Sequence, residues 1–354
     1  MALCILNSET KTEVLLAHKV VTTKVFVVKR ESTNIAASNN LSQMSVNETL
    51  NLQSLAAQLN IASPSAESTI QTDWANQNGI TLTVKRDDLL HPVISGNKWR
   101  KLKYALGVAS KAKVQHIISF GGGFSNHLHA LGYCCHHLNI QLTAIVRGNY
   151  SLNPTPMLLD LMSWQTDIQY VDRNTYQQRS ELDYLQALQQ QYPAASIIPE
   201  GGSQLLALQG VSEMIDELNN TYDYILAPMA SGGTLAGLIS GVGKNKTFSN
   251  CQILGIGVLK GEGYLEKLVA DLLEVNSSQV NWQINHDFHF GGYGKSTNEL
   301  RQFCGDFLQQ TDIPIEPVYS GKLFWGIKAL LNAGYFPENS RILALHTGGL
   351  QGAR

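Results

Sequence analysis

Charge is scarce in this chain. Only 15% of its 354 residues are charged, and the formal net charge at pH 7 is −2. Because neither sign is in excess, the composition indicates no nucleic-acid or polyanion partner. Long apolar runs are also missing, and no segment approaches the length that spans a membrane. The first residues lack the charged region and continuous apolar block of a secretory signal. We therefore expect neither a membrane nor a nucleic acid among the partners.

Cysteine is rare and shows no pairing pattern. The total is odd and two cysteines are adjacent, so the sequence contains no disulfide framework; the five are Cys4, Cys134, Cys135, Cys251 and Cys304. This usage predicts a reducing compartment, the cytoplasm. His136 and His137 follow the adjacent pair and raise the alternative of a metal site. Consecutive residues point to different faces of a helix, so we expect no metal.

The length of the chain and its N-terminal composition indicate how its domains are organised. It is long enough for two domains, and its 30 glycines suit an α/β enzyme with many turns. Residues 1–43 are mixed in composition, and leucines at helical spacing begin only after Met44. We interpret residues 1–43 as an N-terminal extension. A mobile segment, an added strand and translation upstream of a start at Met44 all remain open.

Extended and helical patterns alternate from Thr81 onward. The extended segments are 81–86, 116–120, 142–146, 168–171, 197–199, 224–227, 253–256 and 342–345. One helical segment, 50–59, precedes Thr81. The later ones are 98–106, the stretch from 125, 156–161, 181–190, 205–218, 231–238, 264–273, 298–308 and 322–331. This alternation predicts parallel sheets with helices on both faces. Ligands of such sheets bind at the carboxyl ends of the strands.

Lys98 lies in the first turn of a predicted helix. Gly96 and Asn97 are typical helix-start residues, and Leu102 and Leu106 continue an apolar stripe. A cation is disfavoured there, because the amide end of a helix repels it. The same field lowers the pKa of the amine and favours its neutral, nucleophilic form. A basic surface helix is the alternative.

A glycine loop follows the extended segment 116–120. It reads Gly121-Gly122-Gly123-Phe124-Ser125-Asn126-His127. Glycines let the backbone turn sharply and approach a ligand. Ser125 and Asn126 then stand beside free amides at a helix start, which suits a carboxylate. Ordinary helix capping by Ser125 is the alternative.

A second glycine loop follows the extended segment 224–227. It reads Ala230-Ser231-Gly232-Gly233-Thr234-Leu235-Ala236-Gly237 and opens a helix. The Gly-Lys-Ser/Thr ending of a P-loop is absent, and so is the dinucleotide fingerprint Gly-x-Gly-x-x-Gly. Backbone amides and hydroxyls in this arrangement suit a single phosphate. A lysine at a helix start together with a monophosphate site suggests pyridoxal phosphate (PLP).

The chain resembles the PLP enzymes of the tryptophan-synthase β fold. Among these enzymes, it is similar to the family of D-cysteine desulfhydrase and 1-aminocyclopropane-1-carboxylate (ACC) deaminase. The resemblance spans about residues 82–349. It rests on Lys85-Arg86-Asp87-Asp88, Gly96-Asn97-Lys98, Ser125-Asn126-His127, Pro199-Glu200-Gly201-Gly202-Ser203, Ser231-Gly232-Gly233-Thr234, Tyr293-Gly294, Tyr319-Ser320-Gly321-Lys322 and His346-Thr347-Gly348-Gly349. It implies two open, twisted, mostly parallel sheets with helices on both faces.

The resemblance also implies roles for single residues. Lys98 would bond covalently to the cofactor and act as the base at Cα. Ser125 would hold the substrate carboxylate, and Tyr293 and Tyr319 would line the substrate pocket, where a phenol can transfer a proton. The implied cofactor-binding residues are Lys98, Lys101, Asn126, Ser231, Gly232, Gly233, Thr234, Ser320 and Thr347.

The resemblance further implies a domain division. Residues 101–205 would form a small α/β domain inserted into a large PLP-binding domain of residues 44–100 and 206–354. The small domain would close over an amino-acid substrate, and the protein would be a homodimer.

The substrate is expected to be D-cysteine or a related β-substituted amino acid. ACC deaminases typically carry Glu at the place of Ser320 and Leu at that of Thr347. The resemblance implies that position 320 faces the pyridine nitrogen of the cofactor. A carboxylate there makes the cofactor a stronger electron sink, and ring opening of ACC needs this sink more than elimination does. β-Elimination to pyruvate, ammonia and sulfide is therefore preferred, with ACC deamination as the alternative. Phe124 departs from the family pattern, which usually has Gln there, and leaves the size and chirality of the substrate open.

Overall fold

The computed structural model describes residues 51–273 and 280–353, all of them within one compact unit of the chain. The expectation of an extension over residues 1–43 lies outside this part. Within the described ranges, no helix combines the length and the apolar character needed to cross a membrane.

The larger of two sheets has six strands in the order β1-β2-β10-β7-β8-β9. Strands β2, β10, β7, β8 and β9 run parallel, and β1 pairs antiparallel with β2 at one edge. Their bounds are β1 Glu67–Thr69, β2 Thr81–Lys85, β7 Tyr224–Met229, β8 Gln252–Gly257, β9 Trp282–Asn285 and β10 Arg341–Leu345. The sequence does not predict β1 and β9, because both are short edge strands without a clear alternating pattern.

The smaller sheet has four parallel strands in the order β5-β4-β3-β6. Their bounds are β3 His116–Gly122, β4 Gln141–Arg147, β5 Asp167–Val171 and β6 Ser196–Ile198. Two mostly parallel sheets confirm the predicted α/β class. The strands of this sheet fall inside the segment 101–205, whose limits as an inserted domain remain a prediction.

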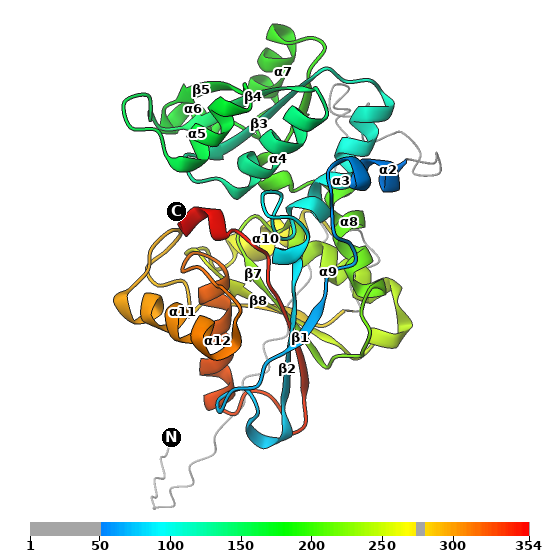
Figure 1. The fold of residues 1–354 in the computed structure, drawn as a ribbon, viewed down its shortest axis with the longest axis vertical. Helices are drawn as coiled ribbons and strands as arrows, with labels where there is room; N and C mark the ends of the chain where they lie inside the picture. The colour runs from blue at the N-terminus through cyan, green and yellow to red at the C-terminus, as the bar shows by residue number, and fades with distance from the viewer. Residues whose placement is uncertain (1–50, 274–279, 354) are drawn as a thin grey trace, which may run out of the picture. The chain divides into compact units, whose positions relative to one another are not determined.

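Helices cover the sheets, as Figure 1 shows. Leu235 and Ile239 of α9 pack with Val211 of α8 in a core on one face of the larger sheet. The bounds are α2 Leu52–Gln58, α3 Lys98–Lys111, α4 Asn126–His137, α5 Pro156–Ser163, α6 Arg173–Gln177, α7 Leu182–Gln191, α8 Leu205–Asp216, α9 Gly233–Lys244, α10 Tyr264–Ala270, α11 Asn298–Thr311 and α12 Ser320–Asn332. The last of these begins at Ser320, two residues before the predicted start, so Ser320 and Lys322 share its first turn.

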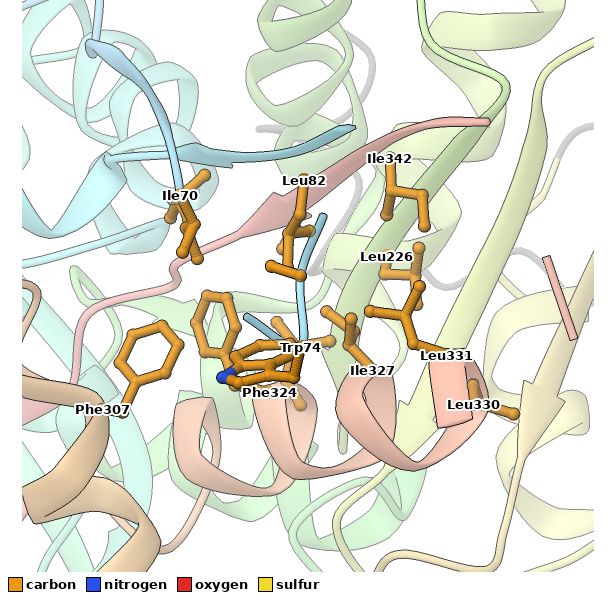
Figure 2. Close-up of a cluster of buried hydrophobic side chains, with 14 of the residues drawn as sticks. Ile70, Trp74, Leu82, Leu226, Phe307, Phe324, Ile327, Leu330, Leu331 and Ile342 are labelled. Carbon is orange, nitrogen blue, oxygen red and sulfur yellow. The ribbon is translucent and has the colours of Figure 1, made fainter. Parts of the chain in front are cut away.

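Helix α12 is anchored by the largest apolar cluster. Figure 2 shows Phe324, Ile327 and Leu331 of this helix beneath Leu82 and other side chains of the sheet. The rings of Phe324 and Phe307 lie 4.6 Å apart between centroids. Full burial of such side chains contributes about 1.5–3 kcal/mol each. This packing fixes the first turn of α12 relative to the carboxyl ends of the strands.

Candidate active site

Lys98 is placed by close backbone packing. It is the first residue of α3, after Gly96 and the N-cap Asn97. Gly96 has a φ of +72°, and a Cβ there would lie 1.6 Å from the carbonyl oxygen of Thr347. Only glycine therefore allows the loop before Lys98 to rest on the loop after β10.

The Lys98 amine has a perturbed pKa. Its Nζ donates to Oδ1 of Asn97 over 2.8 Å. Burial lowers the pKa of Lys98 to about 8, against a smaller opposing effect of the Glu316 carboxylate. The prediction of a lowered pKa agrees with this result, but the largest cause is burial and not the predicted field of the helix amides.

Lys101 lies one helical turn after Lys98 and is buried. Its Nζ donates to Oγ of Ser203 at 2.8 Å and to Oγ of Ser231 at 3.4 Å, and the two hydroxyls are 2.8 Å apart. Its pKa is lowered well below the usual value by burial and by the nearby Lys98. The partners of this buried ammonium are two uncharged hydroxyls, so a bound anion would stabilise its charge.

The loop before α9 completes this anion site. Gly232, the N-cap of α9, has a φ of +83°. A Cβ on Gly233 would lie 2.8 Å from Oγ of Ser203 and 3.1 Å from Cε of Lys101. Thr234 is tied to the Lys98 loop, since Nδ2 of Asn97 donates to its Oγ1 over 2.5 Å. A cradle that a side chain would fill, at the N-terminus of a 12-residue helix and beside an ammonium, fits one phosphate group.

Ser125 and Asn126 begin α4 at the carboxyl end of β3. Ser125 caps the helix, because its Oγ accepts from the Leu128 amide over 3.1 Å. Capping uses the oxygen as an acceptor, so the hydroxyl hydrogen can still be donated to a carboxylate. A Cβ on Gly349 would lie 2.5 Å from Nδ2 of Asn126, and the Gln351 side-chain amide donates to Oδ1 of Asn126.

Tyr293 and Tyr319 form a phenol pair. Their hydroxyls are 2.8 Å apart, and their rings meet edge to face with centroids 5.9 Å apart. Burial raises the pKa of both phenols, that of Tyr319 well above its usual value. The pair therefore stays protonated at neutral pH and can donate a hydrogen bond or a proton.

Ser320 and Thr347 are both buried. The Ser320 Oγ accepts from the backbone amide of Glu316 at 2.9 Å and lies 3.2 Å from its Oε1. The carboxylate of Glu316 also accepts from the amides of Val318, Tyr319 and Ser320 over 2.6–2.9 Å. Glu316 therefore caps α12 and holds Tyr319 and Ser320 in place.

The family can now be assigned. A model of the family described as "Pyridoxal-phosphate dependent enzyme" matches residues 71–348. The chain belongs to this family. The phosphate cradle of Lys101, Ser203, Ser231 and the α9 amides fits the phosphate of that cofactor, and Lys98 is an amine with a lowered pKa nearby.

Several relatives of this PLP-dependent enzyme carry names. A Pyrococcus horikoshii protein named "Putative 1-aminocyclopropane-1-carboxylate deaminase" is 30% identical over 77% of this chain and 86% of its own. An Arabidopsis thaliana protein named "Bifunctional D-cysteine desulfhydrase/1-aminocyclopropane-1-carboxylate deaminase, mitochondrial" is 28% identical over 78% of this chain and 74% of its own. The solved structure of an "ACC deaminase homologue" is 26% identical, with a TM-score of 0.70 over 86% of this chain and 96% of that one.

Some residues of the PLP enzyme's site were missed from sequence. Glu316 is one of them, and Ser203 belongs to the motif Pro199-Glu200-Gly201-Gly202-Ser203 but received no role from the sequence. The buried His127 likewise belongs to the motif Ser125-Asn126-His127 and received no role. Its Nε2 lies 2.8 Å from Oγ of Ser119, which donates to the Ile198 carbonyl, so His127 donates through Nε2. Its Nδ1 has no hydrogen-bond partner among the described residues.

The residues considered for a metal serve other contacts. Cys134 and Cys135 are buried, and burial raises the pKa of both thiols. His137 stacks on the ring of Tyr133, with the ring centroids 3.9 Å apart. Over residues 51–273 and 280–353, no group of three or more His, Cys, Asp or Glu side chains is arranged for a metal ion.

Proposed function

We propose that this PLP-dependent enzyme catalyses β-elimination from D-cysteine or a related β-substituted amino acid. The products would be pyruvate, ammonia and sulfide. The single observation that carries this choice is Ser320, a buried hydroxyl at the start of α12 where the ACC deaminases typically have Glu. The phosphate cradle and Lys98 support the cofactor.

Lys98 is proposed as both the attachment point and the base. PLP, when bound there, would supply an electron sink for the charge that develops at Cα. An amine with a pKa of about 8 is partly neutral at physiological pH, so Lys98 can accept the Cα proton. The Cβ–S bond then breaks with its electron pair on sulfur, and water hydrolyses the released enamine to pyruvate and ammonia.

The remaining residues orient the substrate and donate protons. The Ser125 hydroxyl and the free amides of α4 suit the substrate carboxylate. The protonated phenols of Tyr293 and Tyr319 suit transfer of a proton to the leaving sulfur, because both pKa values are raised. A homodimer, a small domain over residues 101–205 and a cytoplasmic location remain predictions alongside these roles.

ACC deamination is the second candidate. Two observations favour it: relatives and a solved homologue carry that name, and the Glu316 carboxylate lies 3.2 Å from the Ser320 hydroxyl. Three backbone amides already bind the oxygens of Glu316, which argues that this carboxylate caps the helix instead of serving the pyridine nitrogen.

Steady-state kinetics on D-cysteine and ACC decide between the two. We expect the wild type to release sulfide and pyruvate from D-cysteine with little turnover of ACC. Ser320→Glu combined with Thr347→Leu should move activity towards ACC, whereas Ser320→Ala should not. If the wild type turns over ACC faster than D-cysteine, the substrate choice inferred from Ser320 is wrong.

A further inference from the structure

Lys322 is a buried cation that the proposed reaction does not use. It is fully buried in the first turn of α12. Its Nζ donates to three backbone carbonyl oxygens, those of Val258 at 3.0 Å, His289 at 2.9 Å and Gly292 at 2.9 Å. An ammonium has three hydrogens, so these contacts use all of them.

The three carbonyls belong to two separate segments. Val258 directly follows β8, whereas His289 and Gly292 lie in the loop between β9 and Tyr293. This loop has unusual backbone angles, since Gly291 and Gly292 have φ values of +89° and +132°. Ordering such glycines costs conformational entropy, and the contacts of Lys322 offset part of this cost.

The position of Tyr293 depends on that loop. Tyr293 as a whole residue is 48% exposed, and its hydroxyl contact is with Tyr319. Tyr319 is held separately, because the Glu316 carboxylate accepts its backbone N–H at 2.9 Å. Tyr319 is thus held by the Glu316 carboxylate, whereas Tyr293 is held by the loop that Lys322 binds.

A lysine is costly at this place. Burial lowers the pKa of Lys322 to about 8, and the amides of the first helical turn also disfavour a cation. Carbonyl oxygens arranged around a cation replace its water shell, as they do for potassium ions in channel filters. The arrangement is therefore that of a monovalent-cation site with the cation attached to the chain.

We propose that the Lys322 ammonium is a built-in monovalent cation that positions Tyr293 against Tyr319. Lys322 acts through the loop and does not touch the substrate. The inference rests on the proposed role of the phenol pair, and it predicts that a soluble cation can replace the ammonium once the side chain is removed.

The test compares Lys322→Ala, which leaves room, with Lys322→Met, which fills the space without charge. Lys328→Ala is the matched control, since Lys328 lies on the same helix over the rings of Trp74 and Phe303. The first readout is hydrogen exchange of the 286–295 peptide without substrate. We expect faster exchange there in both Lys322 variants and wild-type exchange in Lys328→Ala.

The second readout is rescue. With the substrate that the wild type turns over, kcat of Lys322→Ala should fall at least roughly tenfold with KM changed less, since positioned proton transfer contributes about 10²–10⁴-fold. Potassium, ammonium or propylammonium should restore both exchange protection and kcat in Lys322→Ala but not in Lys322→Met. Tetramethylammonium at equal ionic strength should restore neither.

Three results would overturn the proposal. One is wild-type exchange and kcat in Lys322→Met. Another is loss of protection throughout α12 and the core in both variants, which would make Lys322 a general folding residue. The third is equal rescue by tetramethylammonium. A wild type inactive on D-cysteine would count against the proposed function alone, because loop exchange is measured without substrate.

Discussion

Replacing Gly233 by alanine should separate cofactor binding from folding. Gly233 is the first residue of α9, where alanine is a good helix former. A Cβ there would lie 2.8 Å from Oγ of Ser203 and 3.1–3.2 Å from Cε and Nζ of Lys101. All three atoms are ends of flexible side chains that can move aside. The apoprotein should accommodate the methyl group, but the two groups proposed to bind the phosphate are pushed away.

The expected weakening of PLP binding can be worked out from the hydrogen bonds to the phosphate. A hydrogen bond to a charged group contributes about 1.5–3 kcal/mol. Removing one such bond weakens binding roughly 10- to 150-fold, at about 1.4 kcal/mol per tenfold. Absorbance titration of the apoprotein should give a PLP dissociation constant raised by at least this range, with an unchanged Tm of the apoprotein. Pyridoxal, which lacks the phosphate, should bind the wild type and Gly233→Ala equally.

Gly232→Ala is the matched control, because any side chain at position 232 strains the backbone of the folded apoprotein. Its φ is +83°, and a Cβ would lie 3.0 Å from the Leu268 carbonyl oxygen. A left-handed conformation costs an alanine about 1–2 kcal/mol, so this variant should lower the Tm of the apoprotein. Unchanged PLP affinity in Gly233→Ala, or an equal loss for pyridoxal, would refute the assignment of the cradle to the phosphate.

Two further predictions concern Lys98. Borohydride should fix PLP to Lys98, and Lys98→Ala should lose turnover with its Tm intact; recovery of the reduced cofactor on another lysine by mass spectrometry would contradict this. The rate at which apoprotein takes up PLP should rise with pH to a midpoint near 8, because the folded pKa is lowered from 10.5 to about 8 and only the neutral amine reacts. Well below pH 8 this shift makes the neutral form roughly 300-fold more abundant, and a midpoint near 10.5 would exclude it.

Short motifs in the sequence are the basis for the predicted site residues, whose roles stay predictions. Ser125 and the glycine loop at Gly232 each follow a strand end and precede a helix, and Lys98 is the first residue of α3. The cause of the lowered pKa of Lys98 was misjudged. A helix start is visible in sequence, whereas burial depends on which distant segments cover it.

Contacts between distant segments account for the remaining gaps. Lys322 binds carbonyls 30 to 64 positions away, and backbone carbonyls leave no signature in residue types. Glu316 binds amides only two to four positions away, but backbone amides also leave no signature in residue types. The edge strand β1, only three residues long, gave no pattern either.

The glycines of the site act as contact points between loops. Gly96 rests on the carbonyl of Thr347, and Gly349 rests on the side-chain amide of Asn126. These two contacts are two residues apart on one piece of backbone, which spans at most about 7 Å. Residues 347–349 therefore act as a spacer that sets how far the Lys98 loop lies from the start of α4. A side chain at position 96 or 349 would change that spacing, because the first contact meets rigid backbone and the second meets a short amide with little freedom to move.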